Sequence, residues 1–242
     1  MALKNIIYKQ GDFGISYEIF NQDCQKNLII LHGWGSNKRI MQQSFKNFFN
    51  DFCHIYIDMP GFGNSSAIPF ALSTQDYAEI MKIFLKAINK NADCIIGHSF
   101  GGKVGVLLQP QTLILLSSAG IVTQKSIKVK SKILLTKTLN KIFPNLSGKL
   151  KSILRSSDVK HMDENMYATF KNVVNEDFSD IFANFSHRSF VFWGKEDITT
   201  PLSSGEKIAS LLKDSKFLAL PGDHFFFVGK GKAIQDFYYQ NL

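Results

Sequence analysis

Apolar residues along the chain gather in short runs that recur between segments of helical periodicity. The continuous run at residues 27–31 is typical of a strand buried on both faces of a sheet. Further strand-length runs follow at residues 54–57, 92–97, 113–117, 189–193 and 216–220. Ahead of them, residues 5–10 and 14–20 read as two strands around a Gly11-Asp12 turn, which predicts an antiparallel hairpin. The pattern therefore predicts eight strands.

Helices are predicted in most of the intervals between these strands. Ser73-Thr74-Gln75-Asp76 has the pattern of a helix start, and apolar residues follow it at helical spacing. Further helices are predicted at residues 41–49, 99–108 and 202–212, and at the C-terminal end through Phe237. Strands that alternate with helices imply a mostly parallel sheet covered on both faces. We therefore expect an α/β fold built on an eight-stranded sheet.

The alternation stops between residues 121 and 187, where helical and basic sequence takes its place. This interruption predicts a helical cap, residues 121–187, inserted after the sixth strand. The cap would divide the α/β core into a first part, residues 1–120, and a second part, residues 188–242.

The basic character of the chain belongs to this insertion. Residues 121–160 hold ten Lys or Arg residues and one acid, Asp158, a charge of +9, so the remaining residues sum to −1 in a chain of net charge +8. Lys130, Lys137 and Lys141 recur beside a separate apolar face, which predicts an amphipathic helix. One interpretation is a lid with solvated lysines. The other is weak association with an anionic membrane surface or attraction of a negatively charged acyl substrate.

Size and composition exclude several classes of protein. The chain has 242 residues, 45% hydrophobic and 20% charged, as expected of an ordinary globular protein. Its apolar runs are far too short to span a membrane, and its start lacks the pattern of a secretory signal peptide. Three widely spaced cysteines indicate buried thiols in a reducing compartment. We expect a cytoplasmic protein, and the oligomeric state is not readable from the sequence.

The candidate chemistry begins at Gly97-His98-Ser99-Phe100-Gly101, a G-x-S-x-G pattern directly after a predicted buried strand. Acyl transfer needs a hydroxyl that projects from the fold and a backbone N–H that points at the same space. A tight turn from a strand into a helix provides both, and the helix N-terminus favours a developing oxyanion. Ser99 is therefore the candidate nucleophile.

A serine hydroxyl needs a base, and the base needs an acid to orient it. His224 follows the last predicted strand, and Asp197 follows the strand before it, so both are expected at the same sheet edge as Ser99. Glu196 and Asp223 are competing acids, of which Asp223 is the poorer because it adjoins His224. The predicted catalytic residues are Ser99, Asp197 and His224.

Two backbone amides are expected to hold the oxyanion. His32-Gly33-Trp34-Gly35 follows a buried strand, so the N–H of Trp34 can join that of Phe100. The side chains of Trp34, Phe100 and Phe225 are also candidates for binding the substrate. We interpret His32 as a structural histidine of its loop and expect His98 to pack under the turn.

Together these motifs resemble the α/β-hydrolase superfamily, specifically its capped branch of carboxylesterases and meta-cleavage-product hydrolases. The resemblance covers residues 15–237 and implies an acyl-enzyme on Ser99, with no cofactor and no metal. Ser99 stands where haloalkane dehalogenases and epoxide hydrolases have an Asp. Phe225 follows His224 where meta-cleavage-product hydrolases usually have Trp. These departures favour the ester of a small or medium acyl chain as substrate.

Other functions stay open at this point. Within the superfamily, the alternatives are a thioesterase or acyl-carrier esterase, a lipase, and a hydrolase of carbon–carbon bonds. Outside catalysis, the chain could be a hydrolase-fold protein that binds a ligand with little turnover. Nucleic acid is not an expected partner, because no recognised binding fold accompanies the basic charge.

Overall fold

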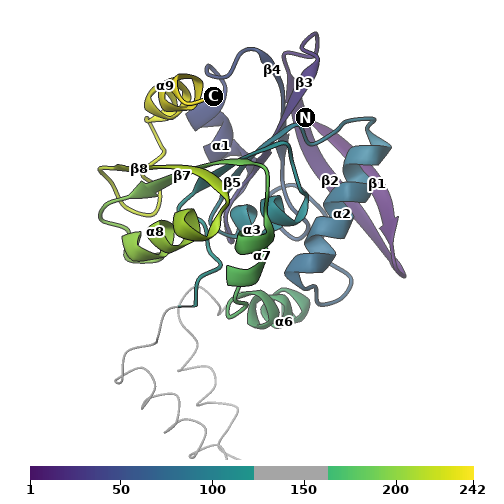
Figure 1. The fold of residues 1–242 in the computed structure, drawn as a ribbon. Helices are drawn as coiled ribbons and strands as arrows, with labels where there is room; N and C mark the ends of the chain where they lie inside the picture. The colour runs from purple at the N-terminus through teal and green to yellow at the C-terminus, as the bar shows by residue number, and fades with distance from the viewer. Residues whose placement is uncertain (123–162) are drawn as a thin grey trace, which may run out of the picture.

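A computed structural model describes residues 1–122 and 163–242 of the chain (Figure 1). Within these two stretches, eight strands form one sheet in the order β1-β2-β4-β3-β5-β6-β7-β8. β1 and β2 form an antiparallel hairpin, β2 is antiparallel to β4, and all other neighbours are parallel. The strands are β1 (Ala2–Tyr8), β2 (Gly11–Phe20), β3 (Lys26–Leu31), β4 (Phe52–Ile57), β5 (Cys94–His98), β6 (Thr112–Leu116), β7 (Arg188–Gly194) and β8 (Asp214–Leu220). The prediction of a mostly parallel eight-stranded sheet is confirmed.

Helices cover both faces of this sheet, as predicted. They are α1 (Lys38–Phe45), α2 (Thr74–Ala87), α3 (Phe100–Leu107), α6 (Glu164–Val173), α7 (Ser179–Asn184), α8 (Leu202–Leu211) and α9 (Gly231–Gln240). Alternate residues of β3 belong to two separate cores, because successive side chains of a strand point to opposite faces. One core includes α1 and α9, and the other includes α2, α3 and α8 (Figure 1).

The hairpin turn lies two residues earlier than predicted. Tyr8 pairs with Gly11, so Lys9 and Gln10 make the turn, and Lys9 has a φ of 52°. Gly11 instead opens β2 in a crowded position, where a Cβ atom would lie 2.5 Å from the Pro69 side chain. This glycine therefore permits close packing of the strand rather than a turn.

The first helix also begins earlier than its predicted range. The predicted helix at residues 41–49 is observed as α1, Lys38–Phe45. Asn37 caps it by accepting a hydrogen bond from the backbone N–H of Arg39. Phe49 lies beyond the helix with a φ of 55°, because the chain turns there toward β4. The cap residue was the available signal for this start, and the apolar pattern alone placed the helix too late.

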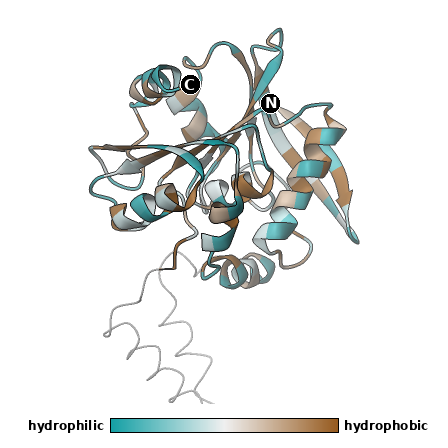
Figure 2. Ribbon diagram, in the orientation of Figure 1, coloured by the Kyte–Doolittle hydropathy of each residue, from teal (hydrophilic) through white to brown (hydrophobic). Residues whose placement is uncertain are grey.

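Helix α2 begins where its sequence predicts. The Ser73 side chain accepts from the backbone N–H of Asp76, and the Asp76 carboxylate accepts from that of Ser73. The apolar residues that follow are buried, among them Tyr77 and Phe84. Figure 2 shows the resulting hydrophobic and hydrophilic bands around this helix.

The region between β6 and β7 contains α6 and α7 in its described part. The predicted amphipathic helix at Lys130–Lys141 lies outside the described residues, and the division into core and cap stays a prediction. In residues 1–122 and 163–242, no helix has the length and apolar character needed to cross a membrane.

A buried ion pair joins the start of α1 to the residue that follows β4. Lys38 Nζ lies 2.6 Å from Asp58 Oδ2, and both side chains are 1% exposed. Asp58 also accepts from the backbone N–H groups of Lys38 and Asn64, and Lys38 donates to Ser16 Oγ. Because each charge of the pair is compensated, it can hold the start of α1 against the end of β4 within the core.

We predict that Lys38→Met lowers the free energy of unfolding by about 3–5 kcal/mol, because it leaves the Asp58 carboxylate buried without its cation. Urea unfolding followed by circular dichroism measures the change. Lys232→Met is the matched control, since it removes the exposed Lys232–Asp236 pair and should leave stability nearly unchanged. Equal effects of the two substitutions would contradict the role assigned to the buried pair.

Candidate active site

Ser99 occupies a strained turn between β5 and α3. Its backbone has a φ of 50° and a ψ of −113°, a conformation that residues other than glycine rarely adopt. Three backbone hydrogen bonds hold it: its N–H donates to Leu116, and its carbonyl accepts from Gly102 and Ala119. The predicted strand-to-helix turn is therefore present at Ser99.

Two glycines allow this turn to pack closely. A Cβ atom on Gly97 would lie 2.6 Å from the carbonyl oxygen of Gly101. A Cβ atom on Gly101 would lie 2.5 Å from that of Leu31, at the end of the neighbouring strand β3. Any larger residue at either position would push the start of α3 away from the sheet.

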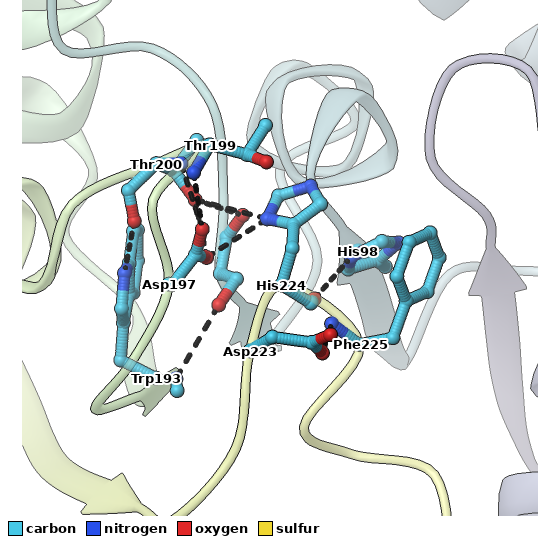
Figure 3. A network of polar contacts seen from close by, with 10 residues as sticks. His98, Trp193, Asp197, Thr199, Thr200, Asp223, His224 and Phe225 are labelled. Carbon is cyan, nitrogen blue, oxygen red and sulfur yellow. Dashed lines mark hydrogen bonds and ion pairs between the residues drawn. The ribbon is translucent and has the colours of Figure 1, made fainter.

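His224 and Asp197 form a hydrogen-bonded pair at this same edge. His224 Nδ1 lies 2.8 Å from Asp197 Oδ2, and their side chains are 13% and 0% exposed (Figure 3). Asp197 belongs to the loop after β7, and His224 to the loop after β8. An Nδ1–H that donates to the carboxylate leaves Nε2 of a neutral imidazole as the proton acceptor. Of the three candidate acids, the structure pairs Asp197 with His224.

Thr199 and Thr200 complete the surroundings of Asp197, and the sequence analysis did not single them out. Their backbone N–H groups donate to Asp197 Oδ1, at 2.8 and 2.9 Å. Thr200 Oγ1 donates to Asp197 Oδ2 at 2.8 Å and lies 3.2 Å from His224 Nδ1 (Figure 3). An aspartate commonly accepts from the backbone N–H two residues further on, so Asp197 itself was the available signal for this turn.

These contacts keep Asp197 ionised. Burial by itself raises the pKa of the carboxyl group, but the hydrogen bonds from His224 and Thr200 outweigh it and lower the pKa to about 2. Asp197 is therefore a permanent negative charge beside the imidazole at neutral pH.

The two competing acids, Glu196 and Asp223, have other partners than the His224 ring. Glu196 accepts a hydrogen bond from the backbone N–H of Gly222, and Asp223 accepts from that of Phe225. Both contacts order the loop that carries His224. The acidic side chains around Asp197 therefore shape the loop rather than orient the imidazole.

A cavity of about 630 Å³ opens beside Ser99. Ser99, Trp34, Phe100 and Thr200 lie on its wall. It is also lined by residues from α3, α6 and the segments after β6, α6 and β7: Lys103, Ala119, Gly120, Ile121, Val122, Phe170, Val173, Val174, Asn175, Glu176 and Thr199. The indole of Trp34 packs edge to face against Phe100, with ring centroids 5.5 Å apart. Most of these side chains are apolar, so the cavity suits a ligand with an apolar portion.

The two expected oxyanion donors, Trp34 and Phe100, lie on this wall. In the described part of the chain, the backbone N–H of neither residue makes a hydrogen bond. The structure therefore leaves both amides available at the cavity. Phe225 lies elsewhere: its side chain is 42% exposed and its ring packs 5.1 Å from that of His98. Its role in binding substrate stays a prediction.

The sequence model of the alpha/beta hydrolase family matches residues 28–224, which include every candidate catalytic residue. The chain belongs to the alpha/beta hydrolase family.

Curated relatives match only part of this hydrolase. It is 34% identical to a 2-succinyl-6-hydroxy-2,4-cyclohexadiene-1-carboxylate synthase from Citrobacter koseri over 86 residues, 36% of this chain and 33% of that protein. It is 36% identical to a pimeloyl-[acyl-carrier protein] methyl ester esterase from Vibrio parahaemolyticus over 78 residues, 32% of this chain and 29% of that protein. The matches thus span about a third of the relatives' length.

Solved structures resemble the hydrolase over nearly its whole length. A thermophilic esterase from Thermogutta terrifontis superposes with a TM-score of 0.71 at 15% identity, covering 99% of this chain and 98% of that one. A hydrolase from Pseudomonas aeruginosa gives a TM-score of 0.74 at 18% identity, covering 98% and 97%. At such identities the likeness shows a shared fold.

Two further histidines of the alpha/beta hydrolase are buried and neutral. His32 Nε2 accepts from the backbone N–H of Met59 and Nδ1 donates to the Gly33 carbonyl, as expected of a structural histidine. His98 Nε2 donates to the carbonyl oxygen of His224 at 3.0 Å (Figure 3). Burial, assisted by the neighbouring His224, lowers the pKa of His98 to about 3. His98 therefore ties the turn at Ser99 to the loop that carries His224.

We predict that His98 makes the hydrolase less stable in acid. In the unfolded chain a histidine takes up a proton near pH 6.5, whereas the folded pKa is about 3. Between these values the unfolded state binds the extra proton, so stability is lost as the pH falls, by about 1.4 kcal/mol per pH unit.

The test compares urea unfolding of the wild type and His98→Gln between pH 3 and pH 7. The glutamine amide can still donate to the His224 carbonyl, but it does not titrate. The difference in stability between the two proteins should shift in favour of the variant as the pH falls. A difference that is independent of pH would contradict the assignment.

Proposed function

We propose that this alpha/beta hydrolase cleaves a carboxylic ester of a small or medium acyl chain through an acyl-enzyme on Ser99. The observation that carries the proposal is the placement of Ser99, on a strained turn at the wall of an apolar cavity, at the sheet edge where His224 pairs with Asp197. This combination supplies a nucleophile, a base and an orienting acid.

The proposed reaction starts with proton transfer from Ser99 Oγ to His224 Nε2 as the hydroxyl attacks the ester carbonyl. The backbone N–H groups of Trp34 and Phe100 donate to the oxyanion of the tetrahedral intermediate. The alcohol then leaves with the proton held by His224, and an acyl group stays on Ser99. Water, deprotonated by His224, attacks the acyl carbonyl and releases the acid, while Asp197 keeps the imidazole oriented.

The cavity supports a small or medium acyl chain. Its volume of about 630 Å³ lies within the usual range for small-molecule sites. Trp34, Phe100 and Phe170 contribute aromatic surface near Ser99, which suits an alkyl or aryl group rather than a strongly polar one.

A second candidate function is hydrolysis of an acyl ester or thioester presented by a carrier. The observation in its favour is a partial match, 36% identical over 78 residues, to a pimeloyl-[acyl-carrier protein] methyl ester esterase. A panel of p-nitrophenyl esters from acetate to decanoate, run beside acyl thioesters, separates the two functions. The proposal requires higher kcat/KM for the free esters.

We expect Ser99→Ala to retain its fold and lose ester hydrolysis by a factor on the order of 10³ or more, because the nucleophile is gone. Hydrolysis of p-nitrophenyl butyrate measures activity, and circular dichroism checks the fold. Labelling by a fluorophosphonate probe, present in the wild type and absent in the variant, identifies the nucleophile. If wild type and variant are equally active, the assignment of Ser99 is wrong. A wild type that neither turns over esters nor reacts with the probe would indicate a ligand-binding protein.

Substitutions of Thr200 test the role of the pair formed by Asp197 and His224. Thr200→Val removes the hydroxyl that donates to Asp197 and should lower kcat about tenfold with little change in KM, because the pair loses a hydrogen bond to a charged group. Thr200→Ser keeps the hydroxyl and should restore most of kcat. Equal kcat values for the valine and serine variants would contradict the role assigned to the hydroxyl.

A further inference from the structure

A second buried ion pair lies on the wall of the cavity that contains Ser99. Lys103 of α3 is 2% exposed, and its Nζ lies 2.6 Å from Oε2 of Glu176, whose side chain is 27% exposed. Both residues line the cavity. An ion pair on a mostly apolar wall is costly to desolvate. Any polar atom of the pair that lacks a hydrogen-bond partner therefore affects which ligands the cavity can bind.

The cation of this pair is already fully engaged. Lys103 Nζ also donates to the Val173 carbonyl at 2.7 Å and lies 4.4 Å from the centre of the Phe178 ring. Burial lowers the pKa of Lys103, and the Glu176 carboxylate opposes that shift. With its donors directed at protein groups, Lys103 is poorly placed to bind an anion from the cavity.

The carboxylate of Glu176 is only half engaged. Oε2 accepts from Lys103 and from the hydroxyl of Thr74. Within the described part of the chain, Oε1 has no hydrogen-bond partner. A carboxylate oxygen can accept more than one hydrogen bond, so Glu176 offers a free acceptor at the cavity.

The Glu176 acceptor and Ser99 line the same cavity. Lys103 follows Ser99 by four residues at the start of α3, so their backbone positions are about one helical turn, or ~6 Å, apart. Glu176 contacts the far end of the Lys103 side chain, so a hydroxyl that reaches it would lie several bonds along the acyl chain from the ester carbonyl.

We propose that Glu176 accepts a hydrogen bond from a hydroxyl group on the acyl chain, so that the preferred substrates are esters of small or medium hydroxy acids. A carboxylate on the acyl chain would be repelled by Glu176. An ammonium group would place a second cation beside Lys103, whereas a neutral hydroxyl supplies the donor without adding charge. This inference rests on the proposed ester hydrolysis and names the class of acyl group.

The experiment measures kcat/KM for two matched pairs of p-nitrophenyl esters, 3-hydroxybutyrate against butyrate and 6-hydroxyhexanoate against hexanoate. In the wild type, at least one hydroxyacyl ester should exceed its partner by about tenfold, since a charge-assisted hydrogen bond is gained. The double variant Lys103→Met/Glu176→Leu replaces the pair by apolar side chains and should lower that ratio about tenfold.

Two further variants make the result decisive. Lys82→Met/Glu79→Leu makes the same kinds of change at an exposed ion pair on α2 and should leave the ratio as in the wild type. Glu176→Gln keeps the shape of the side chain, so it tests the acceptor if the double variant fails to fold, and it should lower the ratio severalfold. Loss of the ratio in the control double variant would overturn the assignment to Glu176.

The outcomes also separate this inference from the proposed function. Turnover of the plain esters without preference for either hydroxyacyl ester overturns the inference and leaves ester hydrolysis intact. A ratio that is unchanged in both Glu176 variants overturns it as well. Absence of turnover for all four esters overturns the proposed function, and the inference with it.

Discussion

The close approach of α3 to the end of β3 is the constraint on which the rest of this structure depends. Gly97 and Gly101 leave no room for a Cβ atom, so the first turn of the helix lies directly against the carbonyl groups of the sheet. The chain can enter that helix only through a residue with positive φ, and Ser99 is that residue. Backbone hydrogen bonds to Leu116 and Ala119 offset the strain. The packing thus fixes where the hydroxyl projects, and the loops after β7 and β8 converge on the same place.

The groups around this turn differ in charge because they have different surroundings and partners. His98 is held neutral by burial and donates to the backbone beside His224, whereas Asp197 is held ionised by the donors that surround it. His224 lies between them, with one ring nitrogen committed to Asp197. The loop carrying His224 is therefore fixed from one side by a neutral ring and from the other by a permanent anion. In the proposed reaction, such fixed surroundings would avoid reorganisation when charge develops at the imidazole.

Sequence reasoning predicted the fold well because buried strands and capped helices have strong local signals. The strand before Ser99 and the helix start at Ser73 needed no tertiary information. The hairpin turn was misplaced because Gly11 serves packing against Pro69, which lies far away in the sequence. Thr200 was missed for a similar reason. Its importance comes from meeting Asp197 and His224 together, and only the loop geometry reveals that meeting.

The two buried lysines show how far sequence reasoning can reach and where it stops. Lys38 and Lys103 look alike in sequence, since each is a lysine in the first turns of a helix that follows a strand. Asp58, the partner of Lys38, is 1% exposed, and its carboxylate oxygens accept from Lys38 and from two backbone amides, so that pair is closed to any ligand. Glu176, the partner of Lys103, is 27% exposed at the cavity and keeps one oxygen free among the described residues. The difference between a closed pair and one that faces the cavity therefore lies in the unused acceptor, which depends on the placement of the segment after α6 against α3.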